Sequence, residues 1–471
     1  MSTIVDIHCH TFNADDLPVR GFLQKVAFHD HLFTDDLAAL VDRVVQGRAP
    51  GHVAENARLD TLLGGAPLPE AAAFAEAAPD PAATIEADVD RTLAEIAATE
   101  PELLHRVGVH LASEGAPPPL GSPQEGALDW FHAARRAVRW AKIYGSYRLD
   151  NTATLLNLFS GRVDLAVPML VDLGMGLSDT APTTQRQQVE LQEKISRLSL
   201  QGRLPAGAQG DVHGFVGFDP RRELRARRVG DIDTPLAVLV DAVTRYGFVG
   251  VKLYPPMGFL PLGNAAAGVP DGAELDGIMR ELFAWCVAEQ VPVTAHGSAS
   301  NAADEEYATF GSPSNWALVL AEFGDLHVNL GHFGGTDDAQ EPWRTGIARL
   351  AAAHPHVYAD VGNHRIDRAE VRTRYLEILG RLFDDPATTV MTDRLMFGTD
   401  WFMLAILPEH DQFLDRYDEL YRAAFGDEAT EAFLGGTALR FLGFDDPANA
   451  NAQRVRRRYA GLDVPDWLAA A

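Results

Sequence analysis

From about residue 163 onward, short apolar runs alternate with amphipathic stretches along the chain. The apolar runs are nearly continuous, which is typical of strands that are buried on both faces of a parallel sheet. Strands are predicted over residues 4–9, 163–171, 212–218, 248–254, 292–296, 328–332, 357–361 and 395–399. Helices are predicted over residues 183–200, 234–246, 274–289, 409–425 and 430–441. This alternation predicts an α/β protein, specifically a (β/α)8 TIM barrel.

A long segment interrupts the alternation directly after the first predicted strand. It contains helix-like runs at 35–45, 87–98 and 128–141 and an Ala/Pro-rich patch at 64–81. A bare barrel needs ~250 residues, and the 471 residues of this chain leave room for a large insertion. We therefore predict a barrel (1–10 and 162–448), a helical cap (11–161) and a tail (449–471) that forms a surface helix.

The insertion leaves from the carboxyl end of the first strand, so we expect it to cover that mouth of the barrel. The alternative is an appendage that docks elsewhere on the surface.

Composition restricts the partners of this protein. A formal net charge of −26 argues against nucleic acid or an anionic membrane, because both repel an acidic surface. The only cysteines are Cys9 and Cys286, which gives no disulfide framework and fits a reducing compartment. No apolar run approaches the ~20 residues of a membrane span, and the N-terminus does not resemble a signal peptide. We expect a cytoplasmic protein that acts on a small molecule, and a homo-oligomer is left open.

Six residues able to hold a metal ion close predicted strands, a position that a parallel barrel gathers at one mouth. They are His8, His10, Lys252, His296, His332 and Asp400. Because side chains alternate along a strand, His8 and His10 face the same way and can reach one ion. A second pair with this spacing, His29 and His31, lies outside any predicted strand, and we interpret it as bonding to solvent or loop.

Mixed imidazole and carboxylate ligands favour Zn²⁺, with Mn²⁺ or Fe²⁺ as alternatives. A metal lowers the pKa of a bound water toward ~7, and Asp400 can accept the proton of that water and pass it to the leaving group. Lys252 has two interpretations. It is either a protonated clamp for the substrate, or a neutral amine that carries CO₂ as a carbamate and bridges two metals.

Three arginines are candidates for binding a substrate carboxylate. Arg221 and Arg222 follow the strand predicted at 212–218, and a guanidinium can hold a carboxylate through two hydrogen bonds. Arg365 follows the strand predicted at 357–361, together with Asn363 and His364. For the first two, a solvated start of the next helix is an equally good interpretation.

These motifs together resemble the amidohydrolase superfamily, in particular the amidohydrolase 2 type that includes the aminocarboxymuconate semialdehyde decarboxylases. The likeness also rests on residues 167–173 (VPMLVDL), 215–220 (FVGFDP) and 434–443 (LGGTALRFLG). By this resemblance, one Zn²⁺ would be bound by His8, His10, His296 and Asp400. His332 would polarise the substrate or carry a proton.

The segment around Lys252 also resembles the dihydroorotase segment whose lysine is carboxylated. That likeness implies two metals, with His296 and His332 on the second. The sequence leaves one metal or two open.

The predicted function is a metal-dependent hydrolase that acts on a C–N or C–O bond of a small, carboxylated substrate. The first alternative is a non-oxidative decarboxylase or hydratase with the same metal ligands. The second is a catalytically silent binding subunit, which we disfavour because all six metal-competent residues are present. The long insertion departs from the family pattern, and we expect it to determine the substrate.

Overall fold

The computed structural model describes residues 3–17, 19–22, 31–45, 49–64, 81–113, 123–177, 181–298, 302–336, 338–367 and 369–469. The strands are β1 (Val5–Cys9), β2 (Leu165–Pro168), β3 (Asp211–Val212), β4 (Phe215–Phe218), β5 (Gly250–Leu253), β6 (Val293–His296), β7 (Val328–Gly331), β8 (Val357–Asp360) and β9 (Leu395–Met396). Strands β1 to β3 form one sheet and β4 to β9 form another, each in chain order. Every pair is parallel, which confirms the predicted α/β class.

Backbone contacts join the two sheets on both sides. Cys9 at the end of β1 bridges to Trp401 beyond β9, and Met169 beyond β2 bridges to Phe215 in β4. The Asp400 N–H also donates to the carbonyl of His8 at 2.7 Å. The first strand and the segment that follows the last strand are therefore hydrogen-bonded neighbours, although they lie at opposite ends of the sequence.

The stretch predicted as a single strand at 212–218 is two strands, so that prediction was wrong in detail. Strand β3 pairs with β2, whereas β4 pairs with β5, and the chain changes partner at His213 and Gly214. His213 binds the Gly247 carbonyl at 3.0 Å and the Tyr459 hydroxyl at 3.2 Å. A Cβ at position 214 would lie 2.9 Å from the ring of Phe248, so glycine permits this close packing.

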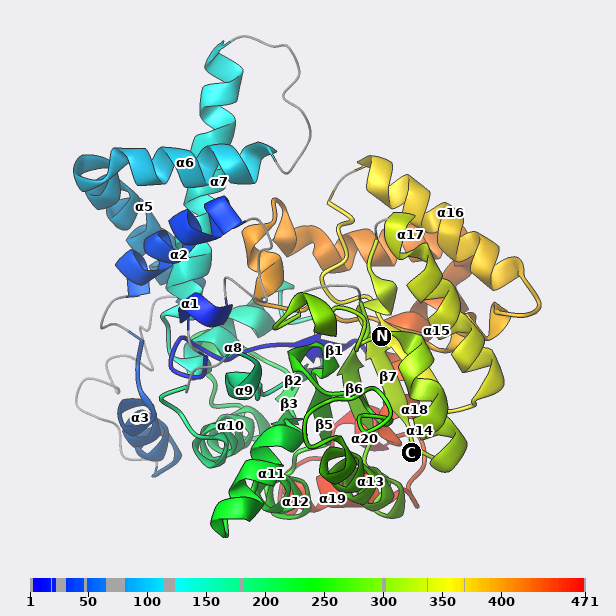
Figure 1. Cartoon of the computed structure of the whole chain (residues 1–471). Coiled ribbons are helices and arrows are strands. Elements are labelled where there is room, and N and C mark those ends of the chain that lie inside the picture. Colours follow the sequence, from blue (N-terminus) through cyan, green and yellow to red (C-terminus); the bar gives the residue numbers. More distant parts are fainter. Residues whose placement is uncertain are drawn as a thin grey trace.

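Helices surround the strands (Figure 1). Those that follow β2 are α9 (Gly174–Leu177), α10 (Gln185–Leu200), α11 (Pro220–Val229), α12 (Pro235–Arg245), α13 (Gly272–Ala288), α14 (Ala317–Glu322), α15 (Glu341–Ala353), α16 (Ala369–Asp384), α17 (Phe413–Glu431), α18 (Thr437–Leu442), α19 (Ala450–Arg458) and α20 (Asp466–Ala469). Helix α10 starts with a capping box, in which Thr184 and Gln187 each accept from the other's backbone N–H. Among the described residues, no helix is long and apolar enough to cross a membrane.

Between β1 and β2, the regular elements of the described residues are all helices. Its helices are α1 (Val19–Phe22), α2 (His31–Val45), α3 (His52–Gly64), α5 (Pro81–Thr99), α6 (Pro101–Ser113), α7 (Pro123–Tyr144) and α8 (Arg148–Leu158). In Figure 1, α1, α2, α5, α6 and α7 form a layer to one side of the strands. Helix α7 contacts the chain beyond β9, where Trp140 and Tyr144 pack on Phe402 with ring centroids 5.5 and 5.6 Å away. Within the Ala/Pro-rich patch, residues 65–80 lie outside the described residues.

A buried ion-pair network fixes the loop that leaves β1. Arg148 of α8 donates two hydrogen bonds of 2.7 Å to Asp16 and one of 2.6 Å to Glu55 in α3. All three side chains are buried, and a buried charge requires such partners. The network therefore anchors the first turns of the insertion only a few residues beyond His10.

The C-terminal tail is helical, and one side of it packs in the core. Val455 of α19 and Trp467 and Leu468 of α20 are buried in one apolar cluster with Val5 and Phe215. The Trp467 indole also donates to the Asp211 carboxylate at 3.0 Å. The arginine-rich sequence of α19 conceals this packing, because only one side of that short helix is apolar.

His213 should make the stability of the fold depend on pH. Burial lowers the pKa of His213 from 6.5 to about 4. Between these values the unfolded chain binds a proton that the folded protein does not, so stability is lost as the pH falls from 6.5 toward 4, by about 3 kcal/mol for one such group.

We expect the stability of His213→Gln to fall less steeply between pH 6.5 and 4, because the variant lacks one group that binds a proton on unfolding. Denaturant unfolding at a series of pH values measures this difference. The exposed His132 of α7 provides the control substitution, His132→Gln. Parallel pH profiles for wild type and His213→Gln would contradict the assignment.

Candidate metal centre and active site

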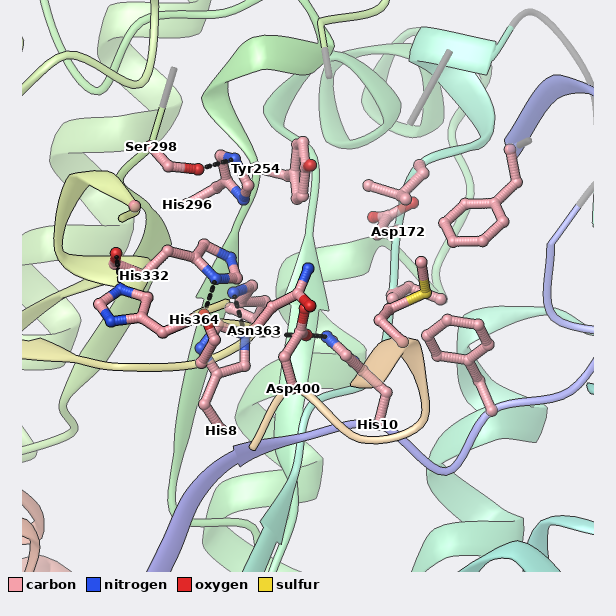
Figure 2. Close-up of a pocket in the computed structure, with 18 of the residues that line it drawn as sticks. His8, His10, Asp172, Tyr254, His296, Ser298, His332, Asn363, His364 and Asp400 are labelled. Atoms are coloured by element: carbon pink, nitrogen blue, oxygen red, sulfur yellow. Dashed lines mark hydrogen bonds and ion pairs between the residues drawn. The ribbon is translucent and has the colours of Figure 1, made fainter. Parts of the chain in front are cut away.

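A cavity of about 230 Å³ opens at the carboxyl ends of the strands. All six residues that the sequence predicted as metal-competent line it: His8, His10, Lys252, His296, His332 and Asp400. They lie in or directly after β1, β5, β6 and β7 and in the segment after β9, as Figure 2 shows for the labelled histidines and Asp400. Of the second histidine pair, His29 and the side chain of His31 lie outside the described residues.

Two imidazoles converge on the Asp400 carboxylate. His10 Nε2 lies 3.1 Å from Asp400 Oδ1, and His8 Nε2 lies 3.7 Å from the same oxygen. His10 Nδ1 donates to the Met169 carbonyl at 2.9 Å, which holds the ring with Nε2 toward Asp400. Asp400 itself has a left-handed backbone (φ 55°), so its side chain is aimed by a constrained turn rather than by a regular strand.

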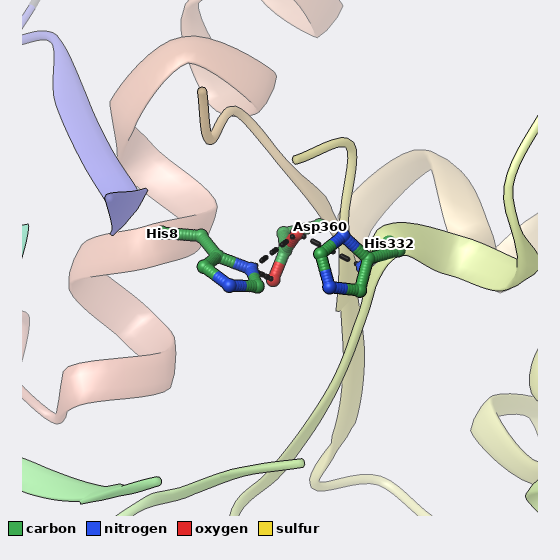
Figure 3. Close-up of side chains that lie close together, drawn as sticks. All are labelled: His8, His332 and Asp360. Carbon is green, nitrogen blue, oxygen red and sulfur yellow. Dashed lines mark hydrogen bonds and ion pairs between the residues drawn. The ribbon is translucent and has the colours of Figure 1, made fainter. Parts of the chain in front are cut away.

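Asp360 at the end of β8 is a central residue that the sequence reading missed. Its carboxylate is 2.9 Å from His8 Nδ1, and it also accepts from Asn329 Nδ2 at 2.7 Å and from the His332 N–H at 3.1 Å (Figure 3). A neutral His8 that donates from Nδ1 presents its Nε2 lone pair toward Asp400. The available signal was a carboxylate closing an apolar strand, the same signal that identified Asp400.

Burial and hydrogen bonds together set the pKa values of His8, Asp360 and Asp400. Burial lowers the pKa of His8 to about 4, so this imidazole is neutral and able to donate from one nitrogen and offer the other. Burial also acts to raise the pKa of Asp360, but His8 and Asn329 hold that pKa well below its usual range. Asp400 is likewise ionised: burial opposes this, but the hydrogen bond with His10 brings the pKa of Asp400 down to about 2.

His296 and His332 complete the histidine cluster. Their ring centroids are 4.6 Å apart, and the His332 ring is 4.7 Å from that of His8. His332 Nδ1 donates to the Gly362 carbonyl at 3.0 Å, and His296 Nε2 is 3.0 Å from Ser298 Oγ. The sequence reading did not select Ser298, which lies only two residues beyond a predicted ligand.

Lys252 lies against this cluster. Its Nζ is 3.1 Å from His8 Nε2, the nitrogen that faces Asp400. Burial lowers the pKa of Lys252 to about 8, with Asp360 and Asp400 opposing the shift. An amine with this pKa is readily neutral at mildly alkaline pH, so both interpretations of the residue remain chemically open.

The structure does not bring all the candidate arginines to the cavity. Arg365 lines it and donates to Asp367 at 3.2 Å. Arg221 and Arg222 are absent from the cavity lining. Arg221 pairs with Asp219 at 2.6 Å, and Arg222 pairs at 2.6 Å with Asp172, a cavity residue.

The donor set suits a transition metal. His8, His10 and Asp400 offer ligand atoms that lie within 4.8 Å of one another, as do His8, His332 and Asp360. In the second group, His8 Nδ1 is already committed to the hydrogen bond with Asp360. The first group therefore fits the ion better, with two imidazole nitrogens and a carboxylate, the ligand types that Zn²⁺ takes.

The opposite wall of the cavity is apolar. Phe12 and Phe22, from the chain that follows β1, line it together with Leu173, Phe218 and Met403. The Phe12 ring lies 5.2 Å from the His10 ring and 5.0 Å from that of Phe402. Side chains of the insertion thus contribute directly to the cavity beside the histidine cluster.

Parts of this chain are similar to known proteins. Residues 221–444 match the family model described as amidohydrolase. An L-fucono-1,5-lactonase from Burkholderia multivorans is 27% identical over 140 residues, which cover 29% of this chain and 46% of that enzyme. The match thus spans about half the length of the curated relative.

Two solved structures are also similar. A crystal structure of an amidohydrolase from Burkholderia multivorans with bound zinc has a TM-score of 0.39 and 16% identity, and covers 62% of this chain and 87% of that one. A TIM-barrel protein from Bordetella bronchiseptica has a TM-score of 0.41 and 15% identity, and covers 73% and 91%. The match of residues 221–444 to the amidohydrolase model agrees with the family resemblance that the motifs predicted.

Replacing Asp360 by Asn should lower the zinc affinity by about 10- to 100-fold, the usual cost of losing the partner that orients a ligating histidine. Both oxygens of the Asp360 carboxylate accept hydrogen bonds, from His8, Asn329 and the His332 N–H. In the Asn variant an NH2 group replaces one of these oxygens and would face a donor without being able to accept its hydrogen. Competition with a chromogenic chelator measures the affinity.

The matched control is Asp241→Asn, whose carboxylate pairs with Arg186 at 3.0 Å outside the cavity. Equal zinc affinity in wild type and Asp360→Asn would show that His8 does not need this partner.

Proposed function

We propose that this protein is a metal-dependent hydrolase that cleaves a C–N or C–O bond in a small, carboxylated substrate. The observation that carries the proposal is the convergence of His8 Nε2 and His10 Nε2 on Asp400 Oδ1. The Nδ1 atom of each imidazole is also hydrogen-bonded, that of His8 to Asp360 and that of His10 to the Met169 carbonyl. Such preorganised ligand sets are what a catalytic metal site requires. The amidohydrolase family supports the reaction class.

His8, His10 and Asp400 would hold the metal, with His296 as the further candidate ligand. A bound Zn²⁺ supplies a Lewis acid and lowers the pKa of a coordinated water, so that hydroxide is available near neutral pH. Lys252 is adjacent to His8 and would either contact the substrate or, as a carbamate, join a second metal. The metal stoichiometry of the purified protein distinguishes these two roles.

The protein's own groups would carry the proton and position the substrate. Asp400 is ionised and can accept a proton from water and return it to the leaving group. His332 is held by the Gly362 carbonyl and by Asp360, and from this fixed position it would polarise the scissile bond or carry a proton. Arg365 is the candidate for the substrate carboxylate, because of the three candidate arginines it is the one that lines the cavity.

The scaffold would be a closed (β/α)8 barrel whose first and last strands are joined by the hydrogen bonds around His8 and Asp400. Residues 11–161 would form its cap. Phe12 and Phe22 support this role, because they line the cavity and would exclude water from it. A cavity of about 230 Å³ is smaller than the ~300–1,000 Å³ of sites for drug-sized ligands, which favours a small metabolite.

Protein purified without chelator should contain a tightly bound transition metal, zinc above all, measured by elemental analysis. His8→Ala combined with His10→Ala should abolish binding, since two of the proposed ligands are lost. His29→Ala combined with His31→Ala serves as the matched control and should retain the metal. Metal-free protein that gains neither activity nor thermal stability from Zn²⁺, Mn²⁺ or Fe²⁺ would overturn the proposal.

Asp400→Asn should reduce turnover by a factor on the order of 10²–10⁴, the usual effect of removing a general acid–base group. The amide keeps an oxygen for the metal but cannot accept a proton, so the fold and part of the metal content should survive. Turnover is followed with a panel of small lactones, esters and amides, and product analysis separates hydrolysis from release of CO₂. Near-normal turnover would remove Asp400 from this role.

A further inference from the structure

Asp172 is a carboxylate inside the cavity that the proposed reaction does not use. It follows β2, and its side chain is only 6% exposed. Figure 2 shows it on the other side of the cavity from His8 and His332. Its neighbours in the chain, Val171 and Leu173, are apolar and also line the cavity. Asp172 is therefore a polar group in the otherwise apolar wall.

The two oxygens of Asp172 have different surroundings. Oδ2 accepts from Arg222 Nε at 2.9 Å, from Arg222 Nη2 at 2.6 Å and from the Asp219 N–H at 2.9 Å. Among the described residues, no group donates a hydrogen bond to Oδ1. Arg222 and the Asp219 backbone thus fix the orientation of the carboxylate and leave one oxygen for a ligand in the cavity.

We infer that Asp172 determines specificity by accepting a hydrogen bond from a substrate hydroxyl or ammonium group that is remote from the scissile bond. This inference rests on the proposed function, because it concerns the same cavity. It adds the class of substrate: a small acyl compound whose far end carries a hydrogen-bond donor. An ether or a methyl group at that end would leave the acceptor unsatisfied.

The environment strengthens this selection. A buried acceptor without a donor carries a desolvation cost, whereas a hydrogen bond to a charged group is stronger than a neutral one. Burial raises the pKa of Asp172, although Arg222 opposes that shift, so the carboxylate gains from one more donor. We expect a ligand that supplies the donor to bind about tenfold to 100-fold more tightly than one that lacks it.

The substitution Asp172→Asn tests this inference without changing the size of the side chain. Arg222 and the Asp219 N–H both donate, so they require the amide oxygen at the position of Oδ2. The amide nitrogen must then face the cavity. The variant would present a donor where the wild-type protein presents an acceptor, so it should lose the preference for ligands that carry a donor.

The probes are 4-hydroxybutanoate, 4-aminobutanoate and 4-methoxybutanoate, measured by calorimetry on the protein as purified. Each has the carboxylate that acyl hydrolysis produces, and they differ only at the far end. Wild type should bind the hydroxy and amino compounds at least tenfold more tightly than the methoxy compound. Asp172→Asn should lose this preference, with the amino compound bound most weakly.

The control variant is Asp241→Asn, whose carboxylate pairs with Arg186 at 3.0 Å and does not line the cavity. It should keep the wild-type order of affinities. Equal ratios in wild type and Asp172→Asn, or no binding of any probe to wild type, would overturn the inference. Failure of the hydrolase proposal would appear instead as missing metal and missing turnover, which do not enter these ratios.

A crystal structure of the wild-type protein with 4-hydroxybutanoate provides a second test that does not depend on the variant. The hydroxyl should lie within hydrogen-bond distance of Asp172 Oδ1. A hydroxyl bound to any other group of the cavity would overturn the inference.

Discussion

The hydrogen bonds between β1 and the segment after β9 are the constraint on which the site depends. The Asp400 N–H donates to the His8 carbonyl, and Thr399 donates from its backbone and its hydroxyl to the buried Asp6 carboxylate at 3.0 and 2.7 Å. These contacts join residues that are more than three hundred positions apart in the sequence. They bring His8 and His10 beside Asp400, and neither half of the chain could form the cluster alone.

Burial and hydrogen bonding then set the protonation states of His8 and Asp360. A neutral His8 beside an ionised Asp360 is stable because the histidine donates from one nitrogen and the carboxylate accepts several further hydrogen bonds. The same burial lowers the pKa of Lys252 to about 8. The site thus combines anionic acceptors, neutral imidazoles and an easily deprotonated amine, although the chain as a whole is strongly acidic.

The insertion and the cluster are mechanically linked through aromatic side chains. Phe402, two residues beyond Asp400, packs against Phe12 and against Trp140 and Tyr144 of α7. The buried Arg148 network holds the same part of the insertion to the loop beyond His10. A shift of α7 would therefore displace both segments that supply the proposed metal ligands, namely the end of β1 with His8 and His10 and the segment with Asp400.

The sequence by itself determined the alternation of strands and helices and the strand-end positions of the histidines and Asp400. These features are local: apolar runs mark buried strands, and a polar residue that closes such a run stands out. The hydrophobic pattern alone was less reliable in two places, where a single apolar run pairs with two sheets and where charged residues surround a short apolar side. The strand predicted at 212–218 divides between two sheets, and the tail from residue 449 has an apolar side hidden among arginines.

Only the tertiary structure decided which polar groups meet. Asp360 carries the same strand-end signal as Asp400, yet its role follows from its contacts with His8, Asn329 and His332, which belong to distant elements. Arg222 pairs with Asp172, a cavity residue, and does not itself line the cavity. Long-range pairing of this kind depends on distances between side chains that lie far apart in the sequence, and hydrophobic periodicity contains no information about such distances.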